Sequence, residues 1–428
     1  MTYKWHVYSK VRSIKQMLSY NINKKTLVID LRIIQRIFCP LLIIACLLLP
    51  RNVVFAEKNT TSEIDVKAKS FVLIEASTGK IICEKQKDKE LMPASITKIM
   101  TIILIFEAID EGKIKMEDMV TVSEHASSMG GSQVYLEVGE TQTVKTMIKC
   151  ISVSSANDAC VAMAEHISGS EEAFVAKMNE KAAELGMEHS HFMNCCGLDD
   201  GLTEGQHYSS AYDIALMSRE LLTKHEEIKE FSTIWMDTIT HVTRKGKSEF
   251  GLTNTNKLVR TYQGITGLKT GSTSKAKYCL SASAERNGLE LIAVVMAAPE
   301  PNTRFVDAAN LLDYGFANCT VYKDENSNLL KQKVKVEKGK KEFVSIAPAK
   351  SFSYLCTNGE SVQEIDKKYE WKKTLLAPVH KGDVVGEIIY YYGEKEIGRV
   401  EIVSVQEIEK AGYLDYLKKC KDSFFVFE

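Results

Sequence analysis

The sequence lacks three features, each of which would assign it to a broad class of protein. Its 428 residues carry 55 Lys and Arg against 56 Asp and Glu, so no excess of positive charge supports nucleic-acid binding as its main role. It has no internal repeats and no low-complexity segment. The apolar run at residues 37–50 is too short to span a bilayer comfortably. These absences leave a folded chain that is long enough for two domains.

The eleven cysteines show neither a disulfide framework nor a metal-binding motif. Cys39 and Cys46 precede residue 56, and the odd number that follows has no repeating spacing. Adjacent Cys195 and Cys196 suggest a redox pair or a zinc site as alternatives, but no second cluster at ligand spacing accompanies them. We therefore expect no metal and no disulfide scaffold.

The first chemical motif, Ser95-Ile-Thr-Lys98, precedes a run that is apolar on almost every side. Residues 99–109 predict a buried core helix, and Gly112 marks its end. Ser95 and Lys98 then share one face of this helix. A lysine whose pKa is lowered by burial and by neighbouring cations can take the proton of the serine hydroxyl. The alternative for Ser95 is an ordinary N-terminal helix cap.

Other serines have the same spacing to a lysine. Ser77-Thr-Gly-Lys80 lies in a turn and Ser274-Lys-Ala-Lys277 lies in a polar loop. Neither precedes a core helix, so the buried helix distinguishes Ser95 from both.

The second motif, Ser155-Ala-Asn157, lies between two helical stretches, one from Val144 and one that runs through residue 167. A hydroxyl and an amide at this junction can relay a proton and hold a substrate peptide. The alternative is a polar cap on the second helix.

The third motif, Lys269-Thr270-Gly271, precedes two apolar runs that are joined by Asn287-Gly288. Asn-Gly between such runs strongly favours a β-hairpin, so the motif is expected at or just before an edge strand. Lysine and a hydroxyl can bind a carboxylate there, and glycine lets substrate approach closely. The N–H groups of Ser95 and Ser272 are the expected donors of an oxyanion hole.

At these residues the chain resembles the low-molecular-weight penicillin-binding proteins, specifically the serine D-alanyl-D-alanine carboxypeptidases. The resemblance runs from about residue 68 to residue 405. Residues 270–280 resemble the branch found in endospore-forming bacteria, with Lys277 in place of the usual glycine. The stretch Asn194-Cys-Cys-Gly197 departs from the family, which more often has proline and threonine there. Since it lies outside the motifs, we expect it to affect the local loop and not the chemistry.

The resemblance implies an α/β (α+β) fold of the β-lactamase/transpeptidase type. An antiparallel sheet is flanked by helices, with a helical lobe, and a small all-β domain follows. The implied activity removes the terminal D-alanine from peptidoglycan stem peptides through an acyl-enzyme, and the protein also binds β-lactams. A role during sporulation is a further implication. No metal or organic cofactor is needed.

The implied site takes residues from all three motifs and one from beyond them. Arg304 matches the family arginine that faces the substrate carboxylate, although a surface arginine that opens a helix is the alternative. In this reaction Lys98 acts as base for Ser95, and Ser155 passes a proton to the leaving D-alanine. The expected catalytic residues are Ser95, Lys98 and Ser155, and the expected substrate-binding residues are Asn157, Lys269, Thr270, Gly271, Ser272 and Arg304.

Three other functions use the same motifs. A β-lactamase shares them but usually has a single domain. A transpeptidase passes the acyl group to an amine instead of water. A non-catalytic β-lactam sensor or wall-binding scaffold is the alternative from another class, although a scaffold is free to lose Ser95, Lys98 and Lys269.

The predicted organisation has four parts. Residues 1–56 form a secretory signal cleaved after Ala56, and Met17 is an alternative start of the chain. The alternative to a cleaved signal is an uncleaved membrane anchor. Residues 57–320 form the carboxypeptidase domain and residues 321–405 a β-sandwich-like domain. Residues 406–428 interleave aromatics with lysines, which fits an interfacial membrane helix or a tail packed on the β domain. The protein is thus expected outside the cytoplasmic membrane, with stem peptides and β-lactams as partners.

Overall fold

The computed structural model describes residues 64–203, 205–324, 329, 332–357 and 359–424. The predicted signal segment and the alternative start at Met17 lie outside the described residues. In the part of the chain that the structure describes, no helix combines the length and the apolar character needed to cross a bilayer.

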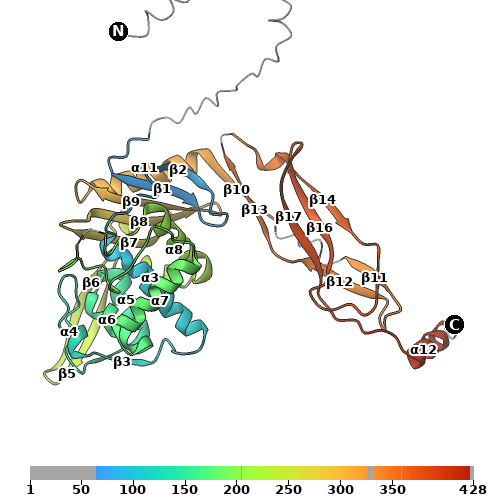
Figure 1. Cartoon of the computed structure of the whole chain (residues 1–428), viewed down its shortest axis with the longest axis horizontal. Helices are drawn as coiled ribbons and strands as arrows, with labels where there is room; N and C mark the ends of the chain where they lie inside the picture. Colours follow the sequence, from blue (N-terminus) through green and yellow to red (C-terminus); the bar gives the residue numbers. More distant parts are fainter. Residues whose placement is uncertain (1–63, 204, 325–328, 330–331, 358, 425–428) are drawn as a thin grey trace, which may run out of the picture. The chain divides into compact units, whose positions relative to one another are not determined.

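A five-stranded antiparallel sheet forms the centre of the N-terminal domain (Figure 1). The hairpin predicted around Asn287-Gly288 is present, a second one joins the first two strands, and the first strand pairs with the last, so that Val72 lies opposite Val294. The strand that carries the third motif is at one edge, as predicted. The sheet order is β2-β1-β9-β8-β7, with β1 at Ser70–Glu75, β2 at Ile81–Lys85, β7 at Ile265–Thr273, β8 at Lys277–Arg286 and β9 at Leu289–Ala298.

Helices cover both faces of this sheet (Figure 1). Helix α11 (Thr303–Asn318) packs on one face, and α8 (Ala211–Lys224) packs on the other. Alternate residues of β9 belong to the two separate cores, since Leu291 packs in one and Ile292 in the other. Because both of its faces are buried, β9 is apolar from Leu291 to Ala298 instead of alternating with polar residues.

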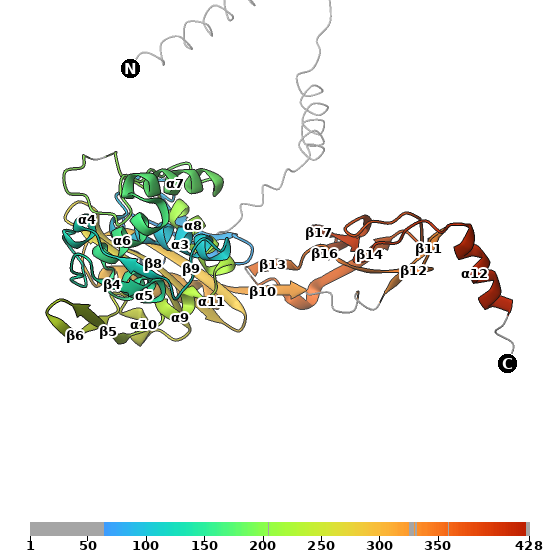
Figure 2. The same cartoon turned by 90° about the horizontal axis from the view of Figure 1, so that it is seen from below.

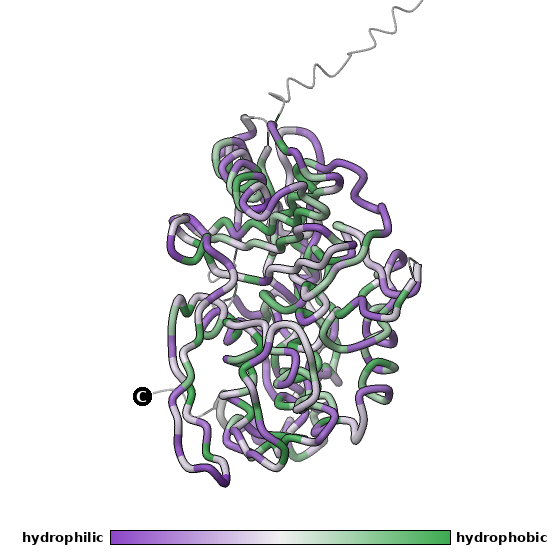
Figure 3. Tube along the Cα trace, turned by 90° about the vertical axis from the view of Figure 1, so that its left-hand side faces the viewer, coloured by the Kyte–Doolittle hydropathy of each residue, from purple (hydrophilic) through white to green (hydrophobic). Residues whose placement is uncertain are grey.

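A helical lobe lies beside the sheet and contains α3 (Lys98–Asp110), which is buried on nearly every side as predicted. Its start differs from the prediction, because Ala94–Thr97 forms a turn of 3-10 helix, η1, before the α-helix begins. Figure 3 shows hydrophobic segments inside and hydrophilic segments along the outer loops. The other helices are α4 (Glu124–Ser127), α5 (Val144–Ser154), α6 (Asn157–Ser168), α7 (Glu171–Glu184), α9 (Ile228–Ser232) and α10 (Leu258–Thr261).

Two short ribbons flank the lobe. Strands β3 (Met119–Thr121) and β4 (Thr141–Thr143) pair with each other. Strands β5 (Met236–Thr243) and β6 (Gly246–Thr253) form a longer hairpin that contacts α5.

The C-terminal region is all-β, as predicted, up to its last helix. Strand β10 (Cys319–Asp324) pairs with β13 (Phe352–Thr357), and the Phe352 ring stacks on Tyr390 at a centroid distance of 3.7 Å. A six-stranded sheet has the order β14-β16-β17-β12-β11-β15. Its strands are β11 (Lys333–Glu337), β12 (Phe343–Pro348), β14 (Ile365–Trp371), β15 (Thr374–Leu376), β16 (Val384–Tyr392) and β17 (Lys395–Ser404).

The tail forms helix α12 (Tyr413–Phe424), next to the β11–β12 end of this sheet (Figure 2). Lys419 Nζ donates to Gly339 O at 2.9 Å. Tyr413 and Leu414 are 78% and 76% exposed, so these apolar side chains do not pack on the β domain. The domain boundaries after residues 320 and 405 remain predictions.

Candidate active site

Ser95 and Lys98 meet where η1 continues into α3. Lys98 Nζ lies 3.0 Å from Ser95 Oγ, and the lysine is fully buried. The amine also donates to Asn157 Oδ1 at 2.6 Å and to Cys196 O at 2.7 Å. Lys98 Nζ thus has three hydrogen-bond partners, and the hydroxyl of Ser95 is one of them. The arrangement therefore suits proton transfer from the serine hydroxyl to the lysine.

The second motif forms the junction between α5 and α6. Ser155 caps α5 in the left-handed conformation, with φ of 60°, and Asn157 begins α6. Asn157 Nδ2 donates to Gly130 O at 2.7 Å, which orients its Oδ1 toward Lys98. Ser155 Oγ is buried and has no hydrogen-bond partner among the described residues. This hydroxyl is thus available to a bound substrate.

The third motif lies on edge strand β7 and carries a buried lysine. Lys269 is 2% exposed, and its Nζ donates to Thr270 O at 3.1 Å. Burial, Lys98 and Arg304 together hold the pKa of Lys269 well below its usual range. Thr270 Oγ1 donates to Thr255 Oγ1 at 2.7 Å, and Ser272 continues the strand opposite Tyr278 of β8. An anionic ligand would stabilise the charged form of this lysine.

Arg304 lies in the first turn of α11 and reaches the same strand. Its Nη1 donates to Gly271 O at 3.0 Å and to Cys279 O at 3.4 Å, and its buried Nε has no partner in the described chain. The structure thus brings Arg304 and all three motifs to one place. Three basic side chains around one serine suit a substrate that ends in a carboxylate.

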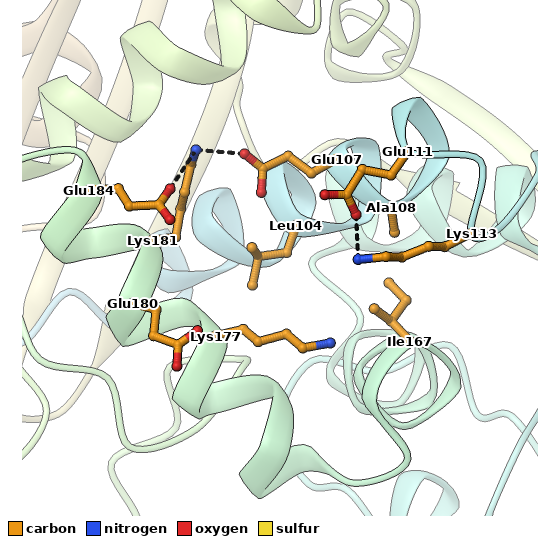
Figure 4. Close-up of a pocket in the computed structure, with 10 residues that line it drawn as sticks. All are labelled: Leu104, Glu107, Ala108, Glu111, Lys113, Ile167, Lys177, Glu180, Lys181 and Glu184. Atoms are coloured by element: carbon orange, nitrogen blue, oxygen red, sulfur yellow. Dashed lines mark hydrogen bonds and ion pairs between the residues drawn. The ribbon is translucent and has the colours of Figure 1, made fainter.

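A separate hollow of about 240 Å³ lies between α3 and α7 (Figure 4). Lys181 pairs there with Glu107 at 2.6 Å and with Glu184 at 3.4 Å, and Lys113 pairs with Glu111. None of the motif residues lines it. The hollow is therefore a charged surface depression outside the candidate site.

Comparison with known proteins assigns this arrangement to a family. The family model described as D-alanyl-D-alanine carboxypeptidase matches residues 57–300, which is more than half of the chain. The chain belongs to the D-alanyl-D-alanine carboxypeptidase family. A second model, described as the C-terminal domain of penicillin-binding protein 5, matches residues 316–410.

Individual relatives cover most of the carboxypeptidase. This chain is 44% identical over 368 residues to the D-alanyl-D-alanine carboxypeptidase DacF of Bacillus subtilis. The aligned residues make up 86% of this chain and 92% of that protein. The crystal structure of penicillin-binding protein 5 from Haemophilus influenzae matches with a TM-score of 0.66 at 30% identity, over 81% of this chain and 98% of that chain. A variant of the Streptomyces K15 DD-transpeptidase matches with a TM-score of 0.54 at 28% identity, over 59% of this chain and 98% of that chain.

These comparisons confirm the family, the fold class and the serine carboxypeptidase activity that the sequence resemblance implied. The match to the Bacillus subtilis enzyme agrees with the branch inferred from residues 270–280. The roles of the individual site residues remain proposals.

The loop Asn194–Gly197 contacts the site through its backbone. Cys196 O accepts from Lys98 Nζ, and Cys195 O accepts from Thr101 Oγ1 at 2.6 Å. Any residue supplies such a carbonyl, so the expectation that the departure from the family pattern affects the local loop and not the chemistry stays a prediction. The loop lies 98 residues from Lys98 in the sequence, so only packing brings it to the carboxypeptidase site. All nine cysteines among the described residues are free thiols, and the same residues hold no cluster suited to a metal ion.

Sequence reasoning also missed the residues that hold this loop. Asn194 Oδ1 accepts from Gly197 N at 2.7 Å, and Glu171 Oε1 accepts from Cys195 N at 3.0 Å. Gly197 has φ of +83°, and a Cβ there would lie 1.9 Å from Ala94 O, beside Ser95. An Asn followed by Gly three residues later is a turn signal that points to the loop, but no sequence signal points to Glu171.

His207 contacts η1 through the side chain of Thr97. Its Nδ1 accepts from Met193 N at 3.2 Å, so Nε2 carries the proton and donates to Thr97 Oγ1 at 2.9 Å. Burial lowers the pKa of His207 to about 4, which keeps it neutral near pH 7. A neutral imidazole in one tautomer fixes the turn that presents Ser95.

Gly271 marks the closest approach of β7 to η1. The sequence suggested that this glycine admits substrate, but a Cβ there would lie 2.6 Å from Pro93 O and 3.1 Å from Ile96 N. Gly271→Ala is therefore expected to displace the turn that carries Ser95. We expect acylation by a fluorescent penicillin to slow on the order of 10- to 100-fold.

The matched control is Gly251→Ala on β6, where a Cβ would meet no atom within 4 Å. It should acylate at the wild-type rate. Stopped-flow fluorescence measures both variants, and wild-type acylation by Gly271→Ala would show that the contact with Pro93 is readily relieved.

An ion pair at Glu171, the residue that binds Cys195 N, links the Asn194–Gly197 loop to the surface. His125 Nε2 lies 2.9 Å from Glu171 Oε2, and the hydrogen bond that His125 donates to Glu171 raises the pKa of His125. Because the folded-state pKa lies above the unfolded value, the pair stabilises the protein fully below the unfolded pKa. This contribution disappears as pH rises through the folded pKa.

His125→Gln is expected to lower the free energy of unfolding at about pH 5.5 by less than about 1 kcal/mol, because the histidine is half exposed. At about pH 8.5 the variant and the wild type should be equally stable. Urea unfolding at both pH values measures this, and an equal loss at both would contradict the assignment.

Proposed function

We propose that Ser95 is the nucleophile and Lys98 its general base in the release of D-alanine from peptidoglycan stem peptides. The observation that carries this proposal is the 3.0 Å contact between Lys98 Nζ and Ser95 Oγ, with the amine also bonded to Asn157 and Cys196. Lys98 takes the hydroxyl proton while Ser95 Oγ attacks the carbonyl of the penultimate D-alanine. The N–H groups of Ser95 and Ser272 hold the oxyanion.

The second half of the reaction uses the other motifs. When the amide C–N bond breaks, Ser155 Oγ gives its proton to the leaving amine and regains one from Lys98. Lys269, Thr270 and Arg304 bind the carboxylate of the departing D-alanine, and Gly271 and Asn157 complete the pocket. Water then hydrolyses the ester on Ser95, so two easier steps replace one difficult one. The reaction needs no metal and no organic cofactor.

Labelling tests the nucleophile directly. The protein is incubated with a fluorescent penicillin, and the modified peptide is identified by mass spectrometry. The label is expected on Ser95 and absent from Ser77 and Ser274, which have the same spacing to a lysine. Release of D-alanine from a peptide that ends in Lys-D-Ala-D-Ala is measured in parallel. A label on another serine would refute the assignment.

Transfer of the acyl group to an amine is a second candidate activity, because one of the similar solved structures is a DD-transpeptidase. Adding an amine acceptor such as glycine to the peptide reaction separates the two. Free acid as the main product supports hydrolysis. A main product that contains glycine would favour transfer.

The proposed location is the outer side of the cytoplasmic membrane, where stem peptides are found, and a role during sporulation is part of the proposal. Helix α12 supports contact with lipid. Its apolar Tyr413, Leu414 and Leu417 are 78%, 76% and 49% exposed, and the exposed Lys418 and Lys421 follow them in the helix. Aromatic and leucine side chains that enter the interface, together with basic residues, favour an anionic bilayer.

A double substitution tests this contact. Leu414→Glu with Leu417→Glu is expected to weaken sedimentation with anionic phospholipid vesicles by at least about 10-fold, because it removes two leucines that would enter the bilayer and adds negative charge. Leu376→Glu on β15, at a leucine that is 61% exposed, is the matched control. Unchanged binding by the double variant would show that α12 does not contact lipid.

A further inference from the structure

Thr255 contacts the segments that carry the second and the third motif. Its N–H donates to Val153 O at 3.1 Å, two residues before Ser155, and its Oγ1 lies 2.7 Å from Thr270 Oγ1. We propose that Thr255 is a positioning residue, which sets the hydroxyl of Thr270 for the carboxylate of the bound substrate. This inference rests on the proposed function, in which Thr270 binds that carboxylate.

Two buried asparagines hold Thr255 in place. Asn254 Nδ2 donates to Ser232 O at 3.0 Å. Asn256 Nδ2 donates to Gly267 O on β7 at 3.1 Å, and Asn256 N donates to Asn254 Oδ1 at 2.9 Å. Because both of its neighbours are anchored, the backbone of Thr255 has a fixed position beside β7.

The two hydroxyl groups have to share their hydrogens. A hydroxyl has one hydrogen, and that of Thr270 is donated to Thr255 Oγ1 in the structure. A carboxylate only accepts hydrogen bonds, so Thr270 binds it only when this hydrogen turns away from Thr255. Thr255 Oγ1 donates to no other atom in the described part of the chain, so its own hydrogen is free to turn to Thr270 Oγ1. Both hydrogens rotate about their C–O bonds, and no proton leaves either oxygen.

The reversed pair forms a chain of two hydrogen bonds, from Thr255 to Thr270 and from Thr270 to the carboxylate. A hydroxyl that accepts one hydrogen bond donates a stronger one, and the charge of the carboxylate strengthens the second bond further. Thr270 is 5% exposed, so little water is available to replace Thr255 as its partner. The Thr255 hydroxyl therefore favours a Thr270 that is held in one rotamer and donates to the substrate.

This pair of hydroxyl groups is not needed to hold β7 against the segment that follows β6. Asn256 Nδ2 already joins that segment to Gly267 O, and the Ser232 hydroxyl donates to Thr266 O at 2.5 Å. We therefore expect loss of the Thr255 hydroxyl to affect the binding of the substrate carboxylate more than the stability of the fold.

A double-mutant cycle in the full chain tests this role. Thr255→Val keeps the size of the side chain and removes its hydroxyl. It is expected to lower kcat/KM for a peptide that ends in Lys-D-Ala-D-Ala by about 3- to 10-fold, mostly through a higher KM. Thr255→Ser restores the hydroxyl and should stay within about twofold of the wild type. In a Thr270→Val background, Thr255→Val should change kcat/KM by less than about twofold, because the group through which it acts is already absent.

The matched control is Thr261→Val on α10, at an exposed threonine whose hydroxyl donates to Lys257 O at 3.2 Å. It should keep the wild-type kcat/KM. A thermal melt checks that each variant is folded. Thr255→Ala, which also lacks the hydroxyl, replaces the valine variant in the cycle if the latter does not fold.

The outcomes separate this role from the proposed function. Wild-type kcat/KM in a folded Thr255→Val protein, or the same loss with and without the Thr270 hydroxyl, would overturn the inference while the hydrolysis stands. An equal loss in Thr255→Ser and Thr255→Val would overturn it as well. If the wild type releases no D-alanine, the proposed function fails. The cycle is then measured on acylation by a fluorescent penicillin, which also carries a carboxylate, and the same results overturn the inference.

Discussion

Replacing Ser95 with alanine is expected to lower the rate of D-alanine release by on the order of 10⁴-fold or more. The alanine cannot form the acyl-enzyme, and the cations around it retain only the ability to bind the substrate carboxylate. The same variant should lose covalent labelling by penicillin completely. The free energy of unfolding should change little, because Ser95 is only partly buried and Lys98 keeps its hydrogen bonds to Asn157 and Cys196.

The matched control is Ser274→Ala, at a serine that has the same spacing to a lysine but follows the third motif. It should release D-alanine at the wild-type rate. Enzymatic detection of free D-alanine measures both variants, and a thermal melt confirms that each is folded. Substantial release by a folded Ser95→Ala protein would refute the covalent mechanism and favour attack by water directly.

Lys98→Met is expected to slow acylation by penicillin and by peptide by about 10²- to 10⁴-fold, the range usual for loss of a general base. Methionine fills most of the space of the lysine stem but donates no hydrogen bond. Asn157 Oδ1 and Cys196 O would lose their 2.6 and 2.7 Å partner, and each unsatisfied acceptor destabilises the fold by about 1–3 kcal/mol. This variant should therefore lose stability as well as activity.

Lys269→Met is the informative comparison, because this lysine is also buried but donates only to Thr270 O. It should raise KM for the peptide, since carboxylate binding is lost, and it should cost less stability than Lys98→Met. Stopped-flow acylation and urea unfolding measure both variants. If Lys98→Met acylated within about 10-fold of the wild type, another group would have to be the base.

The local parts of the site follow from neighbouring residues in the chain. The three-residue spacing of Ser95 and Lys98, before an apolar helix, predicted that their side chains meet. Asn287-Gly288 between two apolar runs predicted the β8–β9 hairpin and thus the edge position of the third motif. Both predictions depend only on helix periodicity and on turn chemistry, which a short segment determines by itself.

The contacts between distant segments came only from the tertiary structure. The Cys195-Cys196 loop, the glycine packing of Gly271 against η1 and the contact of Thr255 with Val153 all join residues far apart in the sequence. Nothing in the composition of the loop predicted that its carbonyl groups would hold the proposed catalytic lysine.

The sequence by itself therefore determined the family, the order of the elements and the identity of the expected reacting groups, because these depend on residue type and short spacing. The tertiary structure decided which backbone atoms hold the amine of Lys98 and which glycines permit close approach. It also decided which hydroxyl is the partner of Thr270. These features depend on atomic distances between packed segments, and such distances follow from the whole fold and not from any one stretch of the chain.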